Sequence, residues 1–142
     1  ITSPFIVHWP AGIKEQGVVK SQAAHIIDIM PTLLELSGAT YPEEFNGNTI
    51  DPYMGESMVS AFTNTEEAPI NETLFWEHFG AAALRQGDWK LVKLDGNADW
   101  ELYNLKEDRT EMNNLAAKYP ERLKAMQEEW NAMAKTTDVF PN

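Results

Sequence analysis

Four short apolar runs follow one another in the second half of the chain, and the connections between them are tight turns. The runs span residues 73–77, 81–85, 89–94 and 100–103. Gly80, Gln86-Gly87-Asp88 and Asp95-Gly96-Asn97-Ala98 connect them, and glycine or Asp-Gly at such short spacing is a hairpin signal. The pattern predicts a four-stranded antiparallel sheet built from consecutive hairpins.

An amphipathic helix is predicted directly after this sheet, beginning near Pro120. Leu123, Met126, Trp130 and Met133 follow one another at steps of 3, 4 and 3, so they form one apolar stripe. A helix with one apolar face and a sheet with one apolar face can bury both against each other. We therefore expect Trp130 to be buried against the sheet.

The first half of the chain has a different pattern. Phe5-Ile6-Val7 is a continuous apolar run of the kind found in strands of parallel sheets. Residues 28–36 are predicted to form a helix that Asp28 caps at its start and Gly38 ends. Residues 41–53 are interpreted as a loop.

A second, short helix is predicted over residues 57–62. The change in pattern after it divides the chain into residues 1–63 and residues 64–142. The predicted fold class is α/β overall, and α+β within this chain.

The charge and the composition argue against several kinds of partner and site. The net charge of −11, with no basic stripe, disfavours nucleic acid and anionic membranes as partners. The chain has no cysteine, which excludes disulfides, thiol catalysis and Cys-ligated zinc. No apolar run approaches the roughly 18 residues of a membrane span.

His78 is the candidate functional residue. It follows the first predicted strand at a tight turn, and functional side chains often collect at such positions. A structural role for it stays open, because no nucleophile or metal-ligand motif accompanies it. His8 and His25 are interpreted as structural, and residues 108–111 as a solvated turn with local hydrogen bonds.

The order of four sequence blocks resembles that of the formylglycine-dependent sulfatases, arylsulfatase-like members of the alkaline-phosphatase superfamily. The first two blocks are Ser3-Pro-Phe-Ile-Val-His-Trp-Pro-Ala-Gly-Ile-Lys14 and His25-Ile-Ile-Asp-Ile-Met-Pro-Thr-Leu-Leu-Glu-Leu-Ser-Gly38. The third is Phe75-Trp-Glu-His78 with Leu84-Arg-Gln-Gly-Asp-Trp-Lys-Leu91, and the fourth is Trp100-Glu-Leu-Tyr-Asn-Leu105 with residues 108–114.

The resemblance implies an architecture and a chemistry. Residues 1–63 would end the large α/β domain of an alkaline-phosphatase-like fold, and residues 64–142 would be its C-terminal sheet and helix. Sulfatases hydrolyse sulfate esters with a formylglycine, made from Cys or Ser, and a divalent cation, usually calcium. Neither the Cys/Ser-x-Pro-x-Arg motif nor the cation ligands occur here. We therefore expect no catalytic or metal residue in this chain, and no activity from it alone.

The same resemblance implies further expectations. His78 would contact the leaving group or a sulfate oxygen of the substrate, with its partners in an N-terminal sulfatase domain outside this chain. The whole protein would be exported or lysosomal. Two alternatives stay open: another metal-dependent phospho- or phosphonate hydrolase of the superfamily, or a non-enzymatic interaction module. Since the strand at Phe5-Ile6-Val7 would lack its neighbours, the chain is expected to self-associate.

Overall fold

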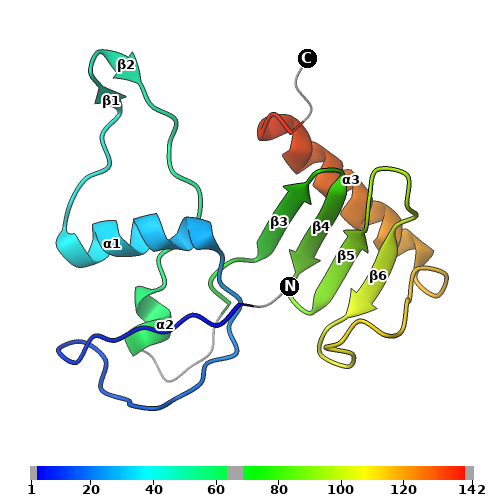
Figure 1. Cartoon of the computed structure of the whole chain (residues 1–142), viewed down its shortest axis with the longest axis horizontal. Coiled ribbons are helices and arrows are strands. Elements are labelled where there is room, and N and C mark those ends of the chain that lie inside the picture. Colours follow the sequence, from blue (N-terminus) through cyan, green and yellow to red (C-terminus); the bar gives the residue numbers. More distant parts are fainter. Residues whose placement is uncertain (1–2, 64–68, 140–142) are drawn as a thin grey trace. The chain divides into compact units, whose positions relative to one another are not determined.

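Two compact units make up the chain, Ile1–Asn71 and Glu72–Asn142. The computed structural model describes residues 3–63 and 69–139. Figure 1 gives the elements of both units and their order along the chain. The predicted boundary between residues 63 and 64 falls at residues 64–68, which lie outside the described residues, and it stays a prediction.

The second unit contains the predicted sheet. Its strands are β3 (Thr73–His78), β4 (Ala81–Gln86), β5 (Trp89–Lys93) and β6 (Glu101–Asn104). They lie in the order β3-β4-β5-β6, and each pairs with its neighbours in antiparallel fashion (Figure 1). Connections at the predicted positions produce this order, because the short turns after β3 and β4 can reach only the adjacent position and the longer loop after β5 also returns the chain beside its own strand.

The core of this unit lies between the sheet and helix α3 (Pro120–Thr136). Leu84, Leu91 and Leu102 stand opposite one another on the three last strands and are fully buried. Met126 and Trp130 of α3 pack against them, and Trp130 is only 2% exposed. The predicted helix and the predicted burial of Trp130 are confirmed.

The first unit contains short elements joined by long loops. Its helices are the 3-10 turn η1 (Ile26–Asp28), α1 (Ile29–Ser37) and α2 (Val59–Thr63), which confirm the two predicted helices with shifted bounds. Gly38 ends α1 in the left-handed conformation, at φ 67°. Glycine tolerates this value without steric cost, which is why the helix ends there.

A small hairpin lies within the region predicted to be a loop. Strands β1 (Glu44–Phe45) and β2 (Asn48–Thr49) pair across Asn46 and Gly47, whose φ values are 52° and 80°. Both values are positive, as the tightest two-residue hairpin turn requires, and Asn-Gly is the sequence most favoured there. The loop prediction for residues 41–53 was therefore wrong at this position.

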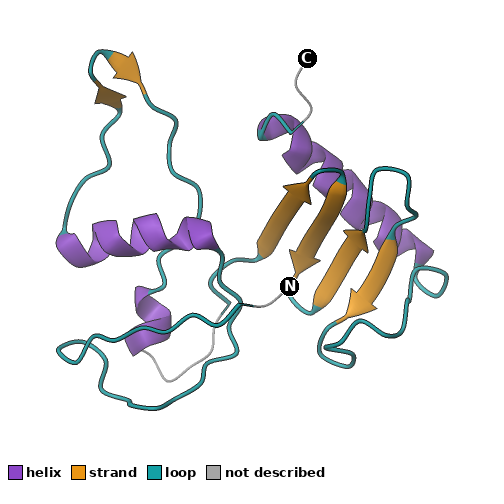
Figure 2. Cartoon of the chain, in the orientation of Figure 1, coloured by secondary structure: helices purple, strands orange, loops and turns teal. Residues whose placement is uncertain are grey.

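The prediction of a buried strand at Phe5-Ile6-Val7 was also wrong. Residues 3–9 form no strand (Figure 2). The side chain of Ile6 is 89% exposed. A strand is stabilised by hydrogen bonds to a neighbouring strand, and no segment of the described residues pairs with this one. The apolar run alone did not determine the conformation.

Asp28 connects three parts of the first unit. Its side chain is fully buried and accepts hydrogen bonds from the backbone N–H of His25 at 2.7 Å and of Glu56 at 3.0 Å. The side-chain amide of Asn71 donates a third at 2.8 Å. The expected cap is therefore corrected, because the carboxylate makes no capping bond to the first turn of α1. It joins the entry of η1 to residues 56 and 71 instead.

Thr32 and Gly55 complete this buried connection. The hydroxyl of Thr32 donates to the backbone oxygen of Asp28 at 2.6 Å and accepts from the backbone N–H of Met58 at 2.9 Å. Gly55 has φ 98°, and a Cβ at that position would lie 2.6 Å from the carbonyl oxygen of Ile27. Only glycine fits there, so Asp28, Thr32 and Gly55 together hold α1 beside residues 55–58.

We expect the chain to self-associate in solution through apolar residues of the first unit. Phe5, Ile6, Val18, Val19, Ile26 and Leu33 are all exposed. Apolar surface of this kind is favourably buried against another surface. Sedimentation should show a mass that rises with concentration, and Ile6→Ser with Val19→Ser should reduce the rise. Leu94→Ser, at an exposed residue of the second unit, is the control. A monomer at every concentration contradicts the expectation.

Candidate functional site

The β3–β4 turn carries His78, the residue predicted from the sequence to contact a substrate. His78 is the last residue of β3 and stands opposite Ala81. Its ring lies edge-on to the ring of Phe79, with 4.6 Å between centroids. Phe79 is 92% exposed and has φ 50°, a conformation uncommon for an aromatic residue. The turn therefore presents two adjacent rings to its surroundings.

Local contacts hold this turn in one conformation. The carboxylate of Glu77 accepts a hydrogen bond from the backbone N–H of Gly80 at 2.8 Å. Gly80, at φ 88°, lies so close to the next loop that a Cβ there would be 3.1 Å from the backbone nitrogen of Gly96. In that loop, Asp95 accepts from the backbone N–H groups of Asn97 and Ala98 at 2.8 and 2.9 Å. The β3–β4 turn is therefore held by its own hydrogen bond and by the close approach of one neighbouring loop.

The chemistry available at this turn is limited to one imidazole. Within the described part of the chain, the His78 side chain makes no hydrogen bond or ion pair. The same described residues contain no group of three or more His, Asp or Glu side chains that could hold a metal ion. His78 can therefore exchange a proton or a hydrogen bond with a group brought to it, and it has no nucleophile beside it.

The other two histidines belong to the first unit. His25 caps η1, and its Nδ1 accepts from the backbone N–H of Ile27 at 3.4 Å. His8 lies exposed in the loop before Pro10. The structural interpretation of His25 is confirmed, whereas nothing in the structure gives His8 a role. Sequence reasoning overlooked Phe79, although an aromatic residue before glycine in a two-residue turn is an unusual choice.

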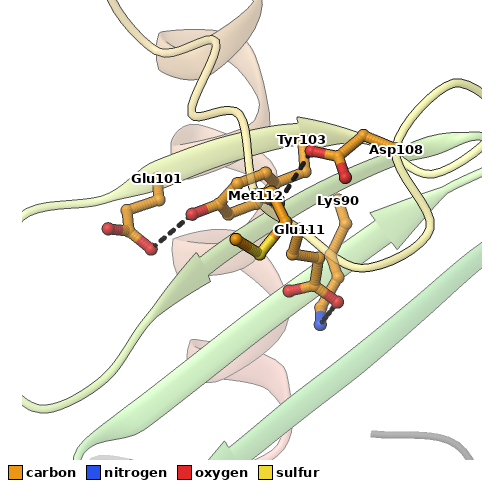
Figure 3. A network of polar contacts seen from close by, with 6 residues as sticks. All are labelled: Lys90, Glu101, Tyr103, Asp108, Glu111 and Met112. Atoms are coloured by element: carbon orange, nitrogen blue, oxygen red, sulfur yellow. Dashed lines mark hydrogen bonds and ion pairs between the residues drawn. The ribbon is translucent and has the colours of Figure 1, made fainter.

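A polar network covers the opposite face of the sheet from α3 (Figure 3). The ammonium of Lys90 contacts a carboxylate oxygen of Glu111 at 2.6 Å, and the Tyr103 hydroxyl donates to Glu101 at 2.9 Å. Asp108 accepts from the backbone N–H groups of Met112 and Asn113 at 2.8 and 2.7 Å. The interpretation of residues 108–111 as a turn with local hydrogen bonds is confirmed.

Two pKa values in this network are shifted in opposite directions. Burial raises the pKa of Tyr103 to about 12, and the hydrogen bond to Glu101 and the charges of Glu101, Glu111 and Asp108 act in the same direction. The hydroxyl therefore stays protonated and keeps donating at neutral pH. Backbone N–H donors from Asn113 and Met112 lower the pKa of Asp108. The network therefore holds residues 108–113 in place against the sheet and is not a proton-transfer site.

The lowered pKa of Asp108 gives a pH-dependent expectation. A carboxylate whose pKa is lower in the folded state stabilises that state above its unfolded pKa, and the contribution is lost as the pH falls through the folded pKa. The amide NMR signals of Met112 and Asn113 should shift together in acid, with a midpoint below the usual aspartate value. Asp108→Asn should abolish this shared transition. A midpoint at the ordinary value contradicts the assignment.

Comparison with known proteins gives a consistent result across the chain. A family model described as N-sulphoglucosamine sulphohydrolase, C-terminal, matches residues 1–138. An uncharacterized sulfatase of Schizosaccharomyces pombe is 32% identical over 98% of this chain and 26% of its own length. The N-acetylglucosamine-6-O-sulfatase of Bacteroides thetaiotaomicron is 28% identical over 81% of this chain and 21% of its own length.

A solved structure has the same fold. It comes from work on glycosaminoglycan metabolism by Bacteroides thetaiotaomicron, and it matches with a TM-score of 0.69 and 23% identity. The match covers 93% of this chain and 29% of that chain. The chain therefore spans about a quarter of the length of the relatives it matches. The predicted fold class, with its small antiparallel sheet and C-terminal helix, is confirmed.

Proposed function

The chain belongs to the N-sulphoglucosamine sulphohydrolase C-terminal family, and from this membership we propose that the whole protein hydrolyses sulfate esters of saccharides. The observation that carries the proposal is the family match over residues 1–138. The saccharide substrate class is supported by a relative named N-acetylglucosamine-6-O-sulfatase. The exported or lysosomal location belongs to the same proposal and rests on family resemblance.

Within that protein, this chain supplies the β3–β4 turn to the substrate pocket. His78 donates a hydrogen bond to the leaving oxygen or to a sulfate oxygen of the substrate. Its exposed ring, the absence of a polar partner among the described residues and the contacts that hold the β3–β4 turn favour this role. A positioned donor at an oxygen where negative charge develops stabilises the transition state.

The nucleophile and the cation come from elsewhere in the whole protein. This chain has no cysteine and no Ser-x-Pro-x-Arg motif, and its described residues hold no cluster suited to calcium. Formylglycine and calcium therefore belong to the part of the protein outside this chain, and the chain alone is inactive. That part also covers the exposed apolar residues of the first unit, such as Ile6 and Val19. In the described residues, no helix is long and apolar enough to cross a membrane.

The test uses the whole protein and a set of sulfated monosaccharides and disaccharides that includes N-acetylglucosamine-6-O-sulfate. His78→Ala should lower kcat/KM by about 10- to 100-fold, the scale for loss of one positioned donor or proton-transfer group. His8→Ala is the matched control and should stay within about twofold, because His8 lies exposed in a loop of the other unit. Absence of any sulfate release from sulfated sugars overturns the function. Full activity in His78→Ala overturns only the role of His78.

A further inference from the structure

Two cations and two aromatic rings meet at the start of α3. Trp89 and Tyr119 pack edge to face, with 5.3 Å between centroids. The guanidinium of Arg122 lies 4.6 Å from the centre of the Trp89 ring, and the ammonium of Lys118 lies 5.3 Å from that of Tyr119. We call Trp89, Lys118, Tyr119 and Arg122 the cation–aromatic cluster. Residues 118–122 line an open depression at its surface.

The two cations of this cluster lack acidic partners. Among the described residues, Lys118 and Arg122 form no ion pair, whereas Lys90 pairs with Glu111 and Lys124 with Glu128. Both side chains are exposed. The chain carries a net charge of −11, so its overall field repels anions. Any anion that binds must find local positive charge, and this cluster provides it.

The aromatic rings fix where that charge lies. An arginine held over a tryptophan face keeps the N–H groups at the edge of its guanidinium plane available, and these match two oxygens of a sulfate or phosphate. The ring contact also restricts the side chain before any ligand arrives, so less conformational entropy is lost on binding. Lys118 adds a second donor beside the same depression.

We propose that the cation–aromatic cluster is a binding site for a sulfate group carried on a saccharide. Arg122 and Lys118 bind the sulfate oxygens, and the exposed part of the Tyr119 ring packs against the carbon–hydrogen face of the sugar ring. Trp89, whose ring lies under Arg122 and against the core, holds the guanidinium in place. The saccharide part of this proposal rests on the proposed function, whereas the anion part rests on the cluster itself. Glu121 lines the same depression and opposes an anion, so the site is only moderately strong.

The experiment measures binding rather than turnover, so its failure is distinguishable from failure of the proposed hydrolysis. The probes are a sulfated glucosamine-containing disaccharide, its unsulfated form and inorganic sulfate, titrated into the 142-residue chain and followed by amide NMR. The sulfated disaccharide should shift the signals of residues 118–122 and the indole signal of Trp89. The unsulfated form should shift them little.

Variants that each remove one positive charge test which residues bind the sulfate group. Arg122→Gln and Lys118→Gln should each weaken binding by about fivefold to tenfold, the scale of one charge-assisted hydrogen bond at an exposed site. Lys124→Gln removes the same charge from a cation on α3 that is already paired with Glu128, and it should change binding less than twofold. Glu121→Gln should tighten binding by about twofold. Arg122→Lys should bind the sulfated disaccharide more weakly than the native chain, because an ammonium cannot present two parallel N–H donors in one plane as a guanidinium does.

Each remaining outcome counts against the proposal. The affinity for the sulfated disaccharide could instead fall equally in Lys118→Gln, Arg122→Gln and Lys124→Gln. That result would mean that the ligand is attracted by positive charge in general, and it overturns the site. Binding of inorganic sulfate as tight as that of the sulfated disaccharide overturns the saccharide part. Binding of the unsulfated disaccharide at equal strength overturns the role of the cations. No shift of residues 118–122 with any probe overturns the whole proposal. Circular dichroism of each variant establishes that it is folded.

Discussion

Asp28→Ala is expected to destabilise the first unit by about 3–5 kcal/mol, because it leaves three hydrogen-bond donors without their acceptor. The carboxylate is completely buried and accepts from His25, Glu56 and Asn71. An unsatisfied buried donor costs about 1–3 kcal/mol, and the side chain of Asn71 can recover part of this by turning toward water. The cavity left by the side chain adds to the cost.

Hydrogen exchange at the amides of Glu56 and Met58 measures this effect within the first unit. Exchange there should accelerate strongly in Asp28→Ala, while the amides of β4 and β5 in the second unit should keep their rates. Asp51→Ala, at an exposed aspartate of the same unit, is the control. Asp28→Asn should have an intermediate effect, because one acceptor oxygen remains. A loss below about 1 kcal/mol in Asp28→Ala would show that the three donors find other partners.

The second unit could be predicted because its signals are local. Each hairpin turn is marked by glycine within two or three residues of the strands that it joins, and the α3 stripe repeats within one helix. Such patterns need no knowledge of distant segments. The structure reproduces all four strands with shifts of only one residue at their ends, and the helix begins at the predicted Pro120.

The first unit was predicted less well because its structure depends on distant partners. The run Phe5-Ile6-Val7 has the composition of a strand, but a strand needs a neighbour and none of the described residues provides one. Asp28 has the position of a helix cap, yet its acceptors serve residues 56 and 71, far along the chain. The β1–β2 hairpin was missed for another reason, because Asn46-Gly47 is a local sequence pattern that predicts a hairpin turn and was not used.

The candidate sites show the same division. The turn at His78 was predicted from sequence, because a histidine before a glycine turn is visible in one short segment. The cation–aromatic cluster was not, because Trp89 at the start of β5 meets Tyr119 and Arg122 at the start of α3 only after folding. No spacing in the sequence records that approach. Sites assembled from separate elements therefore require the structure.

Trp130→Ala is expected to reduce the free energy of unfolding of the second unit by about 3–5 kcal/mol, the usual range for truncating a large core residue. The indole packs between Phe75, at 5.4 Å between centroids, and Trp100, also at 5.4 Å. Its N–H donates to the backbone oxygen of Trp76 at 3.1 Å. The substitution therefore removes apolar burial, two aromatic contacts and one hydrogen bond that ties α3 to β3.

Denaturant unfolding separates these contributions. Trp130→Phe keeps an aromatic ring but lacks the N–H donor. Its free energy of unfolding should fall by about 1–3 kcal/mol, which is less than the fall in the alanine variant. Tyr119→Ala, at a more exposed ring of the same chain segment, is the control for general loss of an aromatic residue and should cost less than either. A midpoint in Trp130→Ala unchanged within error would mean that α3 does not need this residue to stay on the sheet. In that case Leu123, Met126 and Met133 would have to carry the packing, although Trp130 is the largest fully buried side chain of the described residues.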